Sequence, residues 1–337
     1  MKIAVLGLGF MGATHLKAWM QLPGAEVIAV ASDESQRLSG DLSGIQGNVG
    51  GPGERMDFSR MDKYLDWRDA VANPAVEAVD ICLPTHLHAP AAMAALQAGK
   101  HVLVEKPMAL DAASAEAMIA AARGSGRILM AAHVLRFFPA YQALARRLNQ
   151  GDLGPVRHAI FRRRCAAPAW SAWLGDKRLS GGAVLDLLIH DIDIALSLFG
   201  PPEAISATGY EDLARGIDLI TSQWHYAGRT VVITGGWHHP KAYPFSMEYT
   251  VACDEGTMDY NSAGRPPTLY TAGGEEAPLP APEKDGYLAE IEYFHECCSK
   301  GQLPEACPPE QSAAAVKLAI LMAEARGRNG EKIPCPI

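Results

Sequence analysis

Short apolar runs alternate with helical patterns over the first 123 residues of the chain. The runs read IAVLG at 3–7, VIAVA at 27–31, AVDICL at 78–83 and HVLVE at 101–105. Near-continuous apolar runs of this length are typical of strands in a sheet that helices cover on both faces. Helical patterns begin at Met11, Ala89 and Asp111. This alternation predicts a doubly wound α/β domain built on a parallel sheet.

The pattern changes after the turn-forming residues GDLGP at 151–155. One strong helical pattern then covers 182–199, and two more, at 284–300 and 309–326, close the chain. Strand-like runs with hairpin-like breaks lie at 156–165, 204–210, 218–226, 230–237 and 245–253. We therefore predict an α+β second part with a large, mainly antiparallel open sheet. The expected domains are 1–125 and 126–337, with the C-terminal helix packing back on the first domain.

Composition narrows the class of protein. The 337 residues are 48% hydrophobic and 20% charged, as in a folded globular protein. With 30 Lys and Arg against 38 Asp and Glu, the net charge is −8, which disfavours nucleic acid and acidic membranes as partners. No run approaches the roughly 18 apolar residues of a membrane span. The seven cysteines lack the paired spacing of a disulfide framework or a zinc site. We expect a soluble, cytoplasmic protein with reduced thiols.

A glycine-rich turn follows the first predicted strand and opens the first helix. It reads Gly7-Leu8-Gly9-Phe10-Met11-Gly12 and fits the pattern G-x-G-x-x-G. In this setting the glycines allow close backbone approach to a pyrophosphate, which the N–H groups at the helix start then bind. A purely structural turn is the alternative, but the strand and helix on either side favour a dinucleotide site. The candidate residues are Gly7, Gly9, Phe10, Met11 and Gly12, and the domain over 1–125 is predicted to bind a dinucleotide.

The residues at the end of the second strand indicate whether the domain binds NAD or NADP. Ser32 and Asp33 lie 20 and 21 residues after Gly12, where an acidic residue holds the hydroxyls of the adenosine ribose. Because a carboxylate repels a 2′-phosphate, Asp33 favours NAD over NADP. Arg37 is within reach of the same corner and Ser32 can bind either form, so NADP stays open.

Two further segments carry candidate chemistry. Glu105-Lys106-Pro107 follows the strand at 101–104, at the strand end where doubly wound sheets bind ligands. An exposed ion pair is the alternative.

Along the helix at 182–199, Asp186, His190 and Asp193 are spaced i, i+4 and i+7 and share one face. The helix is otherwise so apolar that these groups need partners or a ligand. A satisfied Asp–His pair in the core is the alternative.

A metal site formed by His190, Asp191 and Asp193 is a third interpretation of this helix. Consecutive helical positions diverge by about 100° and do not face one ion easily. We therefore expect no metal.

Four segments resemble the glucose-fructose oxidoreductase, inositol dehydrogenase and MocA family, usually called Gfo/Idh/MocA. They are GLGFMGATH at 7–15, ICLPTHLHAPAAMAALQAGKHVLVEKPMAL at 81–110, RFFPAY at 136–141 and GGAVLDLLIHDIDIALSLFG at 181–200. The resemblance spans nearly the whole chain, and the last segment is especially similar to the catalytic segment of inositol dehydrogenases. It implies a Rossmann domain followed by a substrate-binding and oligomerisation domain. It also implies an NAD(P)-dependent dehydrogenase or reductase acting on CH–OH groups of a cyclitol, sugar or sugar derivative.

The resemblance assigns the catalytic roles to Lys106, Asp186 and His190. His190 is expected to take the hydroxyl proton as hydride leaves for the nicotinamide, with Asp186 orienting the imidazole. Lys106 is expected to hold and polarise the same oxygen. Lys106 is also the alternative proton carrier, and the sequence does not separate the two assignments.

The same resemblance implies contacts with the cofactor and substrate. On the cofactor side it implies Leu83, Pro84, Thr85, His88, Glu105 and Lys106. On the substrate side it implies Arg136, Trp170, Trp173 and His238 beside Asp186 and His190, although simple packing is the alternative for each of the first four.

Other functions stay open. One is a non-catalytic regulator of the same fold that binds a sugar and a dinucleotide. Another is an enzyme acting on a non-sugar such as a bile pigment or a dihydrodiol.

We expect a small-molecule sugar or polyol as substrate, and a homodimer or homotetramer formed through the C-terminal sheet. The apolar side chains predicted on its open face are Ile217, Leu219, Trp224, Val231, Ile233 and, in part, Tyr249.

Overall fold

The computed structural model describes residues 1–45, 47, 53–168 and 172–337 and divides the chain into two compact units. The first comprises Met1–Val134 and Asp285–Ala313, and the second comprises Leu135–Lys284 and Ala314–Ile337. This division differs from the expected boundary at 125/126. Residues 126–134 stay with the first unit because strand β6 (Leu129–Ala132) pairs with its sheet.

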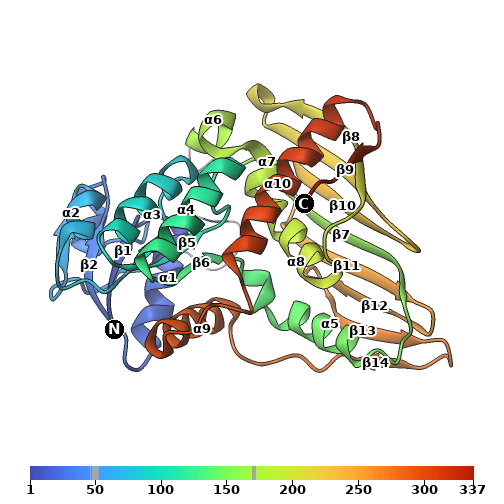
Figure 1. The fold of residues 1–337 in the computed structure, drawn as a ribbon, viewed down its shortest axis with the longest axis horizontal. Coiled ribbons are helices and arrows are strands. Elements are labelled where there is room, and N and C mark those ends of the chain that lie inside the picture. Colours follow the sequence, from blue (N-terminus) through green and yellow to red (C-terminus); the bar gives the residue numbers. More distant parts are fainter. Residues whose placement is uncertain (46, 48–52, 169–171) are drawn as a thin grey trace. The chain divides into compact units, whose positions relative to one another are not determined.

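The first unit is a doubly wound α/β fold, as predicted. Its six strands pair in parallel in the order β3-β2-β1-β4-β5-β6. Their bounds are β1 Lys2–Leu6, β2 Glu26–Ala31, β3 Asp62–Tyr64, β4 Ala78–Ile81, β5 His101–Glu105 and β6 Leu129–Ala132. The helices are α1 Phe10–Gln21, α2 Trp67–Ala72, α3 His88–Gln97, α4 Ala112–Ser125 and α9 Gly286–Lys300. Helices α2, α3 and α4 lie on one face of the sheet, and α1 and α9 on the other (Figure 1). Both faces are covered, which explains the near-continuous apolar strands.

Helix α9 is the late segment that returns to the first unit. Asp285 caps it by accepting hydrogen bonds from the N–H groups of Tyr287 and Leu288, at 3.0 and 3.1 Å. Its Phe294 ring packs edge-on against Trp19 of α1, with ring centroids 6.3 Å apart. The last helix, α10 (Pro309–Gly327), begins in the first unit and continues in the second.

The second unit is built on a nine-stranded sheet in the order β14-β13-β12-β11-β7-β10-β9-β8-β15. Among the described strands, β7 and β10 form its parallel pair and the other neighbours are antiparallel. The bounds are β7 Val156–Ala166, β8 Ala204–Asp212, β9 Ile217–Tyr226, β10 Arg229–His239, β11 Ser246–Cys253, β12 Gly256–Asn261, β13 Arg265–Thr271, β14 Glu276–Pro278 and β15 Ile333–Pro334. The mainly antiparallel open sheet is thus confirmed.

The helices of the second unit are α5 Pro139–Gln150, α6 Lys177–Ser180, α7 Gly182–Asp186, α8 Ile189–Phe199 and most of α10. Helices α5, α7, α8 and α10 lie along one face of the sheet (Figure 1). The single helix expected over 182–199 is therefore wrong, because the chain is interrupted between α7 and α8. The N–H groups of Leu187 and Leu188 both donate to the Ala183 carbonyl, at 2.9 Å each. The second bond spans five residues, which widens the turn and ends α7.

The predicted apolar open face also needs correction. Trp224, Val231, Ile233 and Tyr249 are almost completely buried within one chain. Ile217 and Leu219 are partly exposed. Side chains alternate between the two faces of a strand, so a list that mixes odd and even positions mixes both faces. The four buried side chains lie on the face that the helices cover and are not available to a partner.

None of the described helices is both long and apolar enough to cross a bilayer.

Candidate active site

The glycine-rich segment forms a tight turn between β1 and α1 at the carboxyl edge of the parallel sheet. Gly7 has a left-handed backbone with φ 97°, and its N–H donates to the Ala31 carbonyl at 2.9 Å. A Cβ on Gly7 would lie 2.4 Å from the carbonyl oxygen of Cys82, and one on Gly12 would lie 1.9 Å from that of Gly7. Both distances are far inside van der Waals contact, so the turn requires glycine at both positions.

The start of α1 fits a dinucleotide phosphate. Gly9 is the N-cap, and the helix begins at Phe10 and Met11. N–H groups in the first turn of a helix have no intrahelical carbonyl partner and bind anions. A Cβ on Gly9 would find its nearest neighbour, Nη1 of Arg37, at 3.9 Å. With respect to the residues that the structure describes, the space over Gly9 is therefore open to a ligand, as a pyrophosphate cradle requires.

An acid and a cation both lie where the adenosine ribose is expected. Ser32 and Asp33 directly follow β2; Ser32 is buried and its Oγ accepts from the Glu34 N–H at 3.2 Å, whereas Asp33 is exposed. Arg37 forms an ion pair with Glu34 at 2.7 Å and donates to the Leu8 carbonyl at 3.2 Å. These contacts hold Arg37 beside the glycine turn.

The loop after β4 is fastened to the loop after β5. Leu83, Pro84 and Thr85 lead from β4 through the 3₁₀ turn η2 (Thr85–Leu87) into α3. His88, almost fully buried, places Nδ1 2.8 Å from the Pro107 carbonyl and Nε2 2.7 Å from the Leu83 carbonyl. Burial lowers the pKa of His88 despite these two contacts. The His88 side chain thus connects the two loops, and we expect it to affect cofactor binding through their positions.

Glu105 and Lys106 stand at the carboxyl end of β5. Glu105 is buried, and its Oε2 accepts from the backbone N–H of Lys106 at 2.9 Å. Lys106 is partly exposed, and the bond to Pro107 is cis. The carboxyl edge of the sheet therefore brings together the glycine turn, the loop after β4 and Lys106.

Behind this edge lies a buried polar cluster that the sequence analysis missed. The Nδ1 atom of His15 on α1 lies 2.9 and 3.1 Å from the two carboxylate oxygens of Asp80 on β4. Its Nε2 lies 3.1 Å from Oε1 of Glu105. The indole of Trp19 donates to Asp80 at 2.7 Å. The signal that could have found the cluster is Asp80 itself, a charge inside an otherwise apolar strand.

His15, Asp80 and Cys82 together offer three donor atoms within 4.8 Å of one another. We interpret them as an ion network rather than a metal site. The 2.9 Å distance between His15 Nδ1 and Asp80 Oδ2 is that of a charge-assisted hydrogen bond, and Asp80 also accepts from Trp19. Burial raises the pKa of the Cys82 thiol far above its ordinary value.

A buried carboxylate anchors the start of α7 in the second unit. Oδ2 of Asp218 accepts from the Ala183 N–H at 2.7 Å, and its Oδ1 accepts from Nη1 of Arg326 at 2.5 Å. Gly182 has φ 78°, and a Cβ there would lie 2.6 Å from the same Oδ2. Gly182 therefore allows Asp218 to approach and fix the helix that ends at Asp186.

Asp186 and His190 lie on either side of the break between the two helices. Asp186 ends α7 and His190 is the second residue of α8. Both are partly exposed, whereas their neighbours Leu185, Leu187 and Ile189 are buried. The segment thus presents two titratable groups at the surface of a core element. Lys106 belongs to the first unit, so its convergence with this pair stays a prediction.

Two arginines pair with the remaining acids of α8. Arg136 forms a bidentate ion pair with Asp193, at 2.8 and 2.7 Å, and Arg163 pairs with Asp191 at 2.6 and 3.3 Å. All four side chains are at most 6% exposed. The guanidinium expected to line the substrate pocket at Arg136 therefore neutralises Asp193, the third acid of the predicted polar face.

Of the other candidate substrate residues, Trp173 and His238 do not lie in one common environment. Trp173 is partly buried and packs against a core cluster formed by Cys165, Leu174, Ala183, Leu187 and Trp237. Trp170 lies outside the described residues. His238 is exposed and follows the buried Trp237 on β10, so strand alternation places it toward the face that the helices leave uncovered. We therefore do not keep His238 among the proposed substrate residues.

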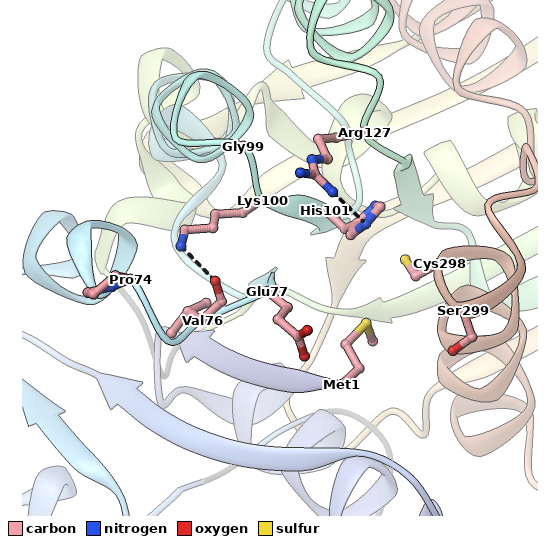
Figure 2. Close-up of a pocket in the computed structure, with 10 residues that line it drawn as sticks. All are labelled: Met1, Pro74, Val76, Glu77, Gly99, Lys100, His101, Arg127, Cys298 and Ser299. Atoms are coloured by element: carbon pink, nitrogen blue, oxygen red, sulfur yellow. Dashed lines mark hydrogen bonds between the residues drawn. The ribbon is translucent and has the colours of Figure 1, made fainter.

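A hollow of about 460 Å³ in the first unit lies at the opposite edge of the parallel sheet (Figure 2). Met1, Glu77 and His101 line it at the amino ends of β1, β4 and β5. The Nζ atom of Lys100 donates a hydrogen bond to the Val76 carbonyl at 2.6 Å. Doubly wound sheets bind their ligands at the carboxyl edge, so this hollow is not the cofactor site.

Comparisons with known proteins cover both units. The family model described as "Oxidoreductase family, NAD-binding Rossmann fold" matches residues 1–133, and that of the "GFO/IDH/MocA C-terminal domain" matches residues 141–259.

Three curated relatives are about equally similar. The chain is 31% identical to D-apiose dehydrogenase of Paraburkholderia graminis over 76% of this chain and 66% of that protein, slightly less than two thirds of its length. It is 31% identical to scyllo-inositol 2-dehydrogenase (NAD(+)) of Bacillus subtilis over 90% of this chain and 87% of that one. It is 30% identical to human trans-1,2-dihydrobenzene-1,2-diol dehydrogenase over 80% of this chain and 83% of that protein.

Solved structures have the same fold. An aldose-aldose oxidoreductase from Caulobacter crescentus, complexed with glycerol, matches with a TM-score of 0.83 and 25% identity over 99% of each chain. A levoglucosan dehydrogenase in complex with NADH and levoglucosan matches with a TM-score of 0.85 and 19% identity over 100% of each chain. The second likeness shows the fold alone.

Proposed function

Because the chain belongs to the GFO/IDH/MocA oxidoreductase family, we propose that it is an NAD(P)-dependent dehydrogenase or reductase acting on a CH–OH group of a cyclitol, sugar or sugar derivative. The observation that carries this proposal is the carboxyl edge of the parallel sheet, where an open glycine cradle lies on the same edge as Lys106. Relatives named as dehydrogenases of D-apiose and scyllo-inositol support a polyhydroxylated substrate.

In the proposed mechanism each residue acts on the reacting CH–OH group. His190 accepts the hydroxyl proton as general base in oxidation and returns it as general acid in reduction. Asp186 orients the imidazole and stabilises its cationic form. The Lys106 ammonium holds and polarises the same oxygen. A bound nicotinamide supplies the hydride acceptor or donor.

The first test measures cofactor binding and turnover separately. NADH binding is followed by fluorescence, and NAD reduction is then measured with a panel of cyclitols, aldoses, ketoses and sugar nucleotides. Binding with turnover of a polyol supports the proposal. Binding without turnover of any polyol would favour the regulator of the same fold. A trans-dihydrodiol belongs in the panel because the human relative of that name covers most of this chain.

We propose NAD as the preferred cofactor. Asp33 is exposed at the end of β2, where its charge repels a 2′-phosphate, whereas Arg37 is already engaged by Glu34 and Leu8. A lower KM and higher kcat with NAD than with NADP are expected. Asp33→Arg is expected to move the ratio of kcat/KM toward NADP by about tenfold or more, since a hydrogen bond to a charged group contributes about 1.5–3 kcal/mol.

The control for this prediction is Asp69→Arg, which makes the same charge change at an exposed position of α2. It is expected to leave the preference unchanged. A wild-type preference for NADP would contradict the assignment of Asp33.

We also propose that a second copy covers the uncovered face of the large sheet. Partly exposed Ile160, Leu219 and Val232 alternate along β7, β9 and β10 with the side chains buried under the helices. Arg164 and Glu248 pair at 2.7 Å between β7 and β11 on the same uncovered face. A flat sheet face with apolar and paired charged side chains suits an isologous contact.

Light scattering at micromolar concentration checks the assembly. We expect a multiple of the 36.0 kDa chain, and a shift to the single chain in Val232→Glu. Leu65→Glu, at an exposed residue of the first unit, is the control and is expected to leave the mass unchanged. A wild-type mass near that of one chain would contradict the proposal, and an intact oligomer in Val232→Glu would place the contact elsewhere.

A further inference from the structure

We propose that His15 is a positioning residue whose imidazolium, buried between Asp80 and Glu105, fixes the Glu105 carboxylate and with it the Lys106 backbone at the cofactor edge of the sheet. This inference rests on the proposed function, since Glu105 and Lys106 matter here as neighbours of the cofactor and substrate.

The geometry places His15 between two acids from adjacent strands. His15 is completely buried on α1, and its two ring nitrogens face Asp80 on β4 and Glu105 on β5 at 2.9 and 3.1 Å. Asp80 is completely buried, and Glu105 nearly so. Removing two carboxylates from water is costly unless a cation accompanies them. The imidazole therefore serves both carboxylates as a shared counter-ion.

Proton counting gives the same result. An imidazole nitrogen faces a carboxylate favourably when it carries a proton, and a histidine that carries both ring protons is a cation. Burial is the largest single effect and opposes this charge, but the interactions with Asp80 and Cys82 together hold the pKa of His15 well above 6.5. Burial likewise raises the pKa of Glu105, but its interactions with His15 and Lys106 lower it overall.

Two other titratable groups lie beside His15: Cys82, which follows β4, and Tyr287 on α9, whose ring centroid lies 6.4 Å away. Burial raises the pKa of both, so they stay neutral near pH 7. His88 and Lys106 interact with Glu105, and both lower its pKa. The carboxylates of Asp80 and Glu105 are therefore the two anionic groups that face the ring nitrogens of His15.

The position of Glu105 is what this counter-ion controls. One carboxylate oxygen of Glu105 faces His15, and the other accepts from the Lys106 N–H at 2.9 Å. The carboxylate thus connects the buried imidazolium to the residue that precedes Pro107. Without His15, Oε1 of Glu105 loses this contact and the carboxylate is held less firmly. His15 is fully buried, so it acts through Glu105 and not on the ligand.

The first experiment compares His15→Gln, Glu105→Gln and the double variant in NADH affinity and in kcat. Loss of a residue that orients a ligand-binding group typically costs about tenfold or more in affinity or activity. We expect His15→Gln to weaken NADH binding about tenfold, and the double variant to lose no more than Glu105→Gln alone. The control is His295→Gln on α9, whose ring contacts the Gly24 carbonyl and which is expected to bind NADH like the wild type.

Additive losses in the double variant, or wild-type affinity in His15→Gln, would overturn the positioning role while leaving the proposed function intact. A wild-type protein that binds neither NADH nor NADPH would overturn both.

The second experiment reads the charge of His15 without any activity. In histidine labelled with ¹³C at Cε1, the His15 NMR signal is the one absent from His15→Gln. If that variant does not fold, it is the signal whose titration moves to lower pH in both Asp80→Asn and Glu105→Gln. We expect it to stay protonated well above pH 6.5 in the wild type. A signal that titrates at or below pH 6.5, or no histidine that responds to both acids, would overturn the proposal.

Discussion

Lys106→Ala and His190→Ala are each expected to lower kcat at least about a hundredfold, because a general acid or base typically contributes 10²–10⁴-fold. Both variants are expected to bind NADH within a few-fold of the wild type. The glycine turn, Asp33 and Glu105 supply most of the proposed cofactor contacts and are left intact. Steady-state kinetics on the substrate found in the panel, together with NADH fluorescence, measure the two quantities separately.

Lys63→Ala, on the edge strand β3, and His295→Ala are the matched controls and are expected to keep the wild-type kcat. The pH profile of kcat then assigns the proton carrier, because the limb that belongs to the carrier disappears when that residue is replaced. Wild-type turnover in either variant would remove that residue from the mechanism.

Asp191→Ala is expected to destabilise the protein by about 3–5 kcal/mol, the usual cost of breaking a buried ion pair by removing one partner. Arg163 is 3% exposed and Asp191 is fully buried, and their closest atoms are 2.6 Å apart. The substitution removes the carboxylate that neutralises the buried guanidinium. Burial raises the pKa of Asp191 although Arg163 opposes it.

Urea denaturation measures this effect, and two further variants interpret it. Asp254→Ala removes the partner of Arg157 in an exposed pair and is expected to change stability little. Arg163→Met combined with Asp191→Leu is expected to recover most of the loss, because apolar side chains of similar volume replace such pairs at little cost. A loss below about 1 kcal/mol in Asp191→Ala, the range of exposed pairs, would contradict the assignment of a buried pair.

Much of the fold could be predicted because its signals are local. The apolar runs placed β1, β2, β5 and β7 to within about a residue of their ends, and the glycine spacing located the turn before α1. Neighbouring residues carry this information through side-chain size, backbone freedom and periodicity. In the Arg162-Arg163-Arg164 run, strand alternation along β7 buries the middle residue and leaves its two neighbours partly exposed.

Which side chains meet was decided by the tertiary structure. His15 and Asp80 are 65 residues apart, Arg136 and Asp193 are 57 apart, and Arg163 and Asp191 are 28 apart. A pattern read along the chain shows that a buried charge needs a partner but does not say which one. The same holds for the sheet face, because a shift of one residue exchanges the two faces.

The sequence by itself thus determined the two kinds of sheet and the glycine turn, and the family resemblance supplied the residues proposed for the chemistry. The tertiary structure decided the break after Asp186, the anchoring of α7 by Asp218, the pairing of Arg136 with Asp193 and the counter-ion at His15. The physical reason is that apolar periodicity and glycine conformation act between neighbours in sequence. Burial and charge pairing act between segments that only the folded chain brings together.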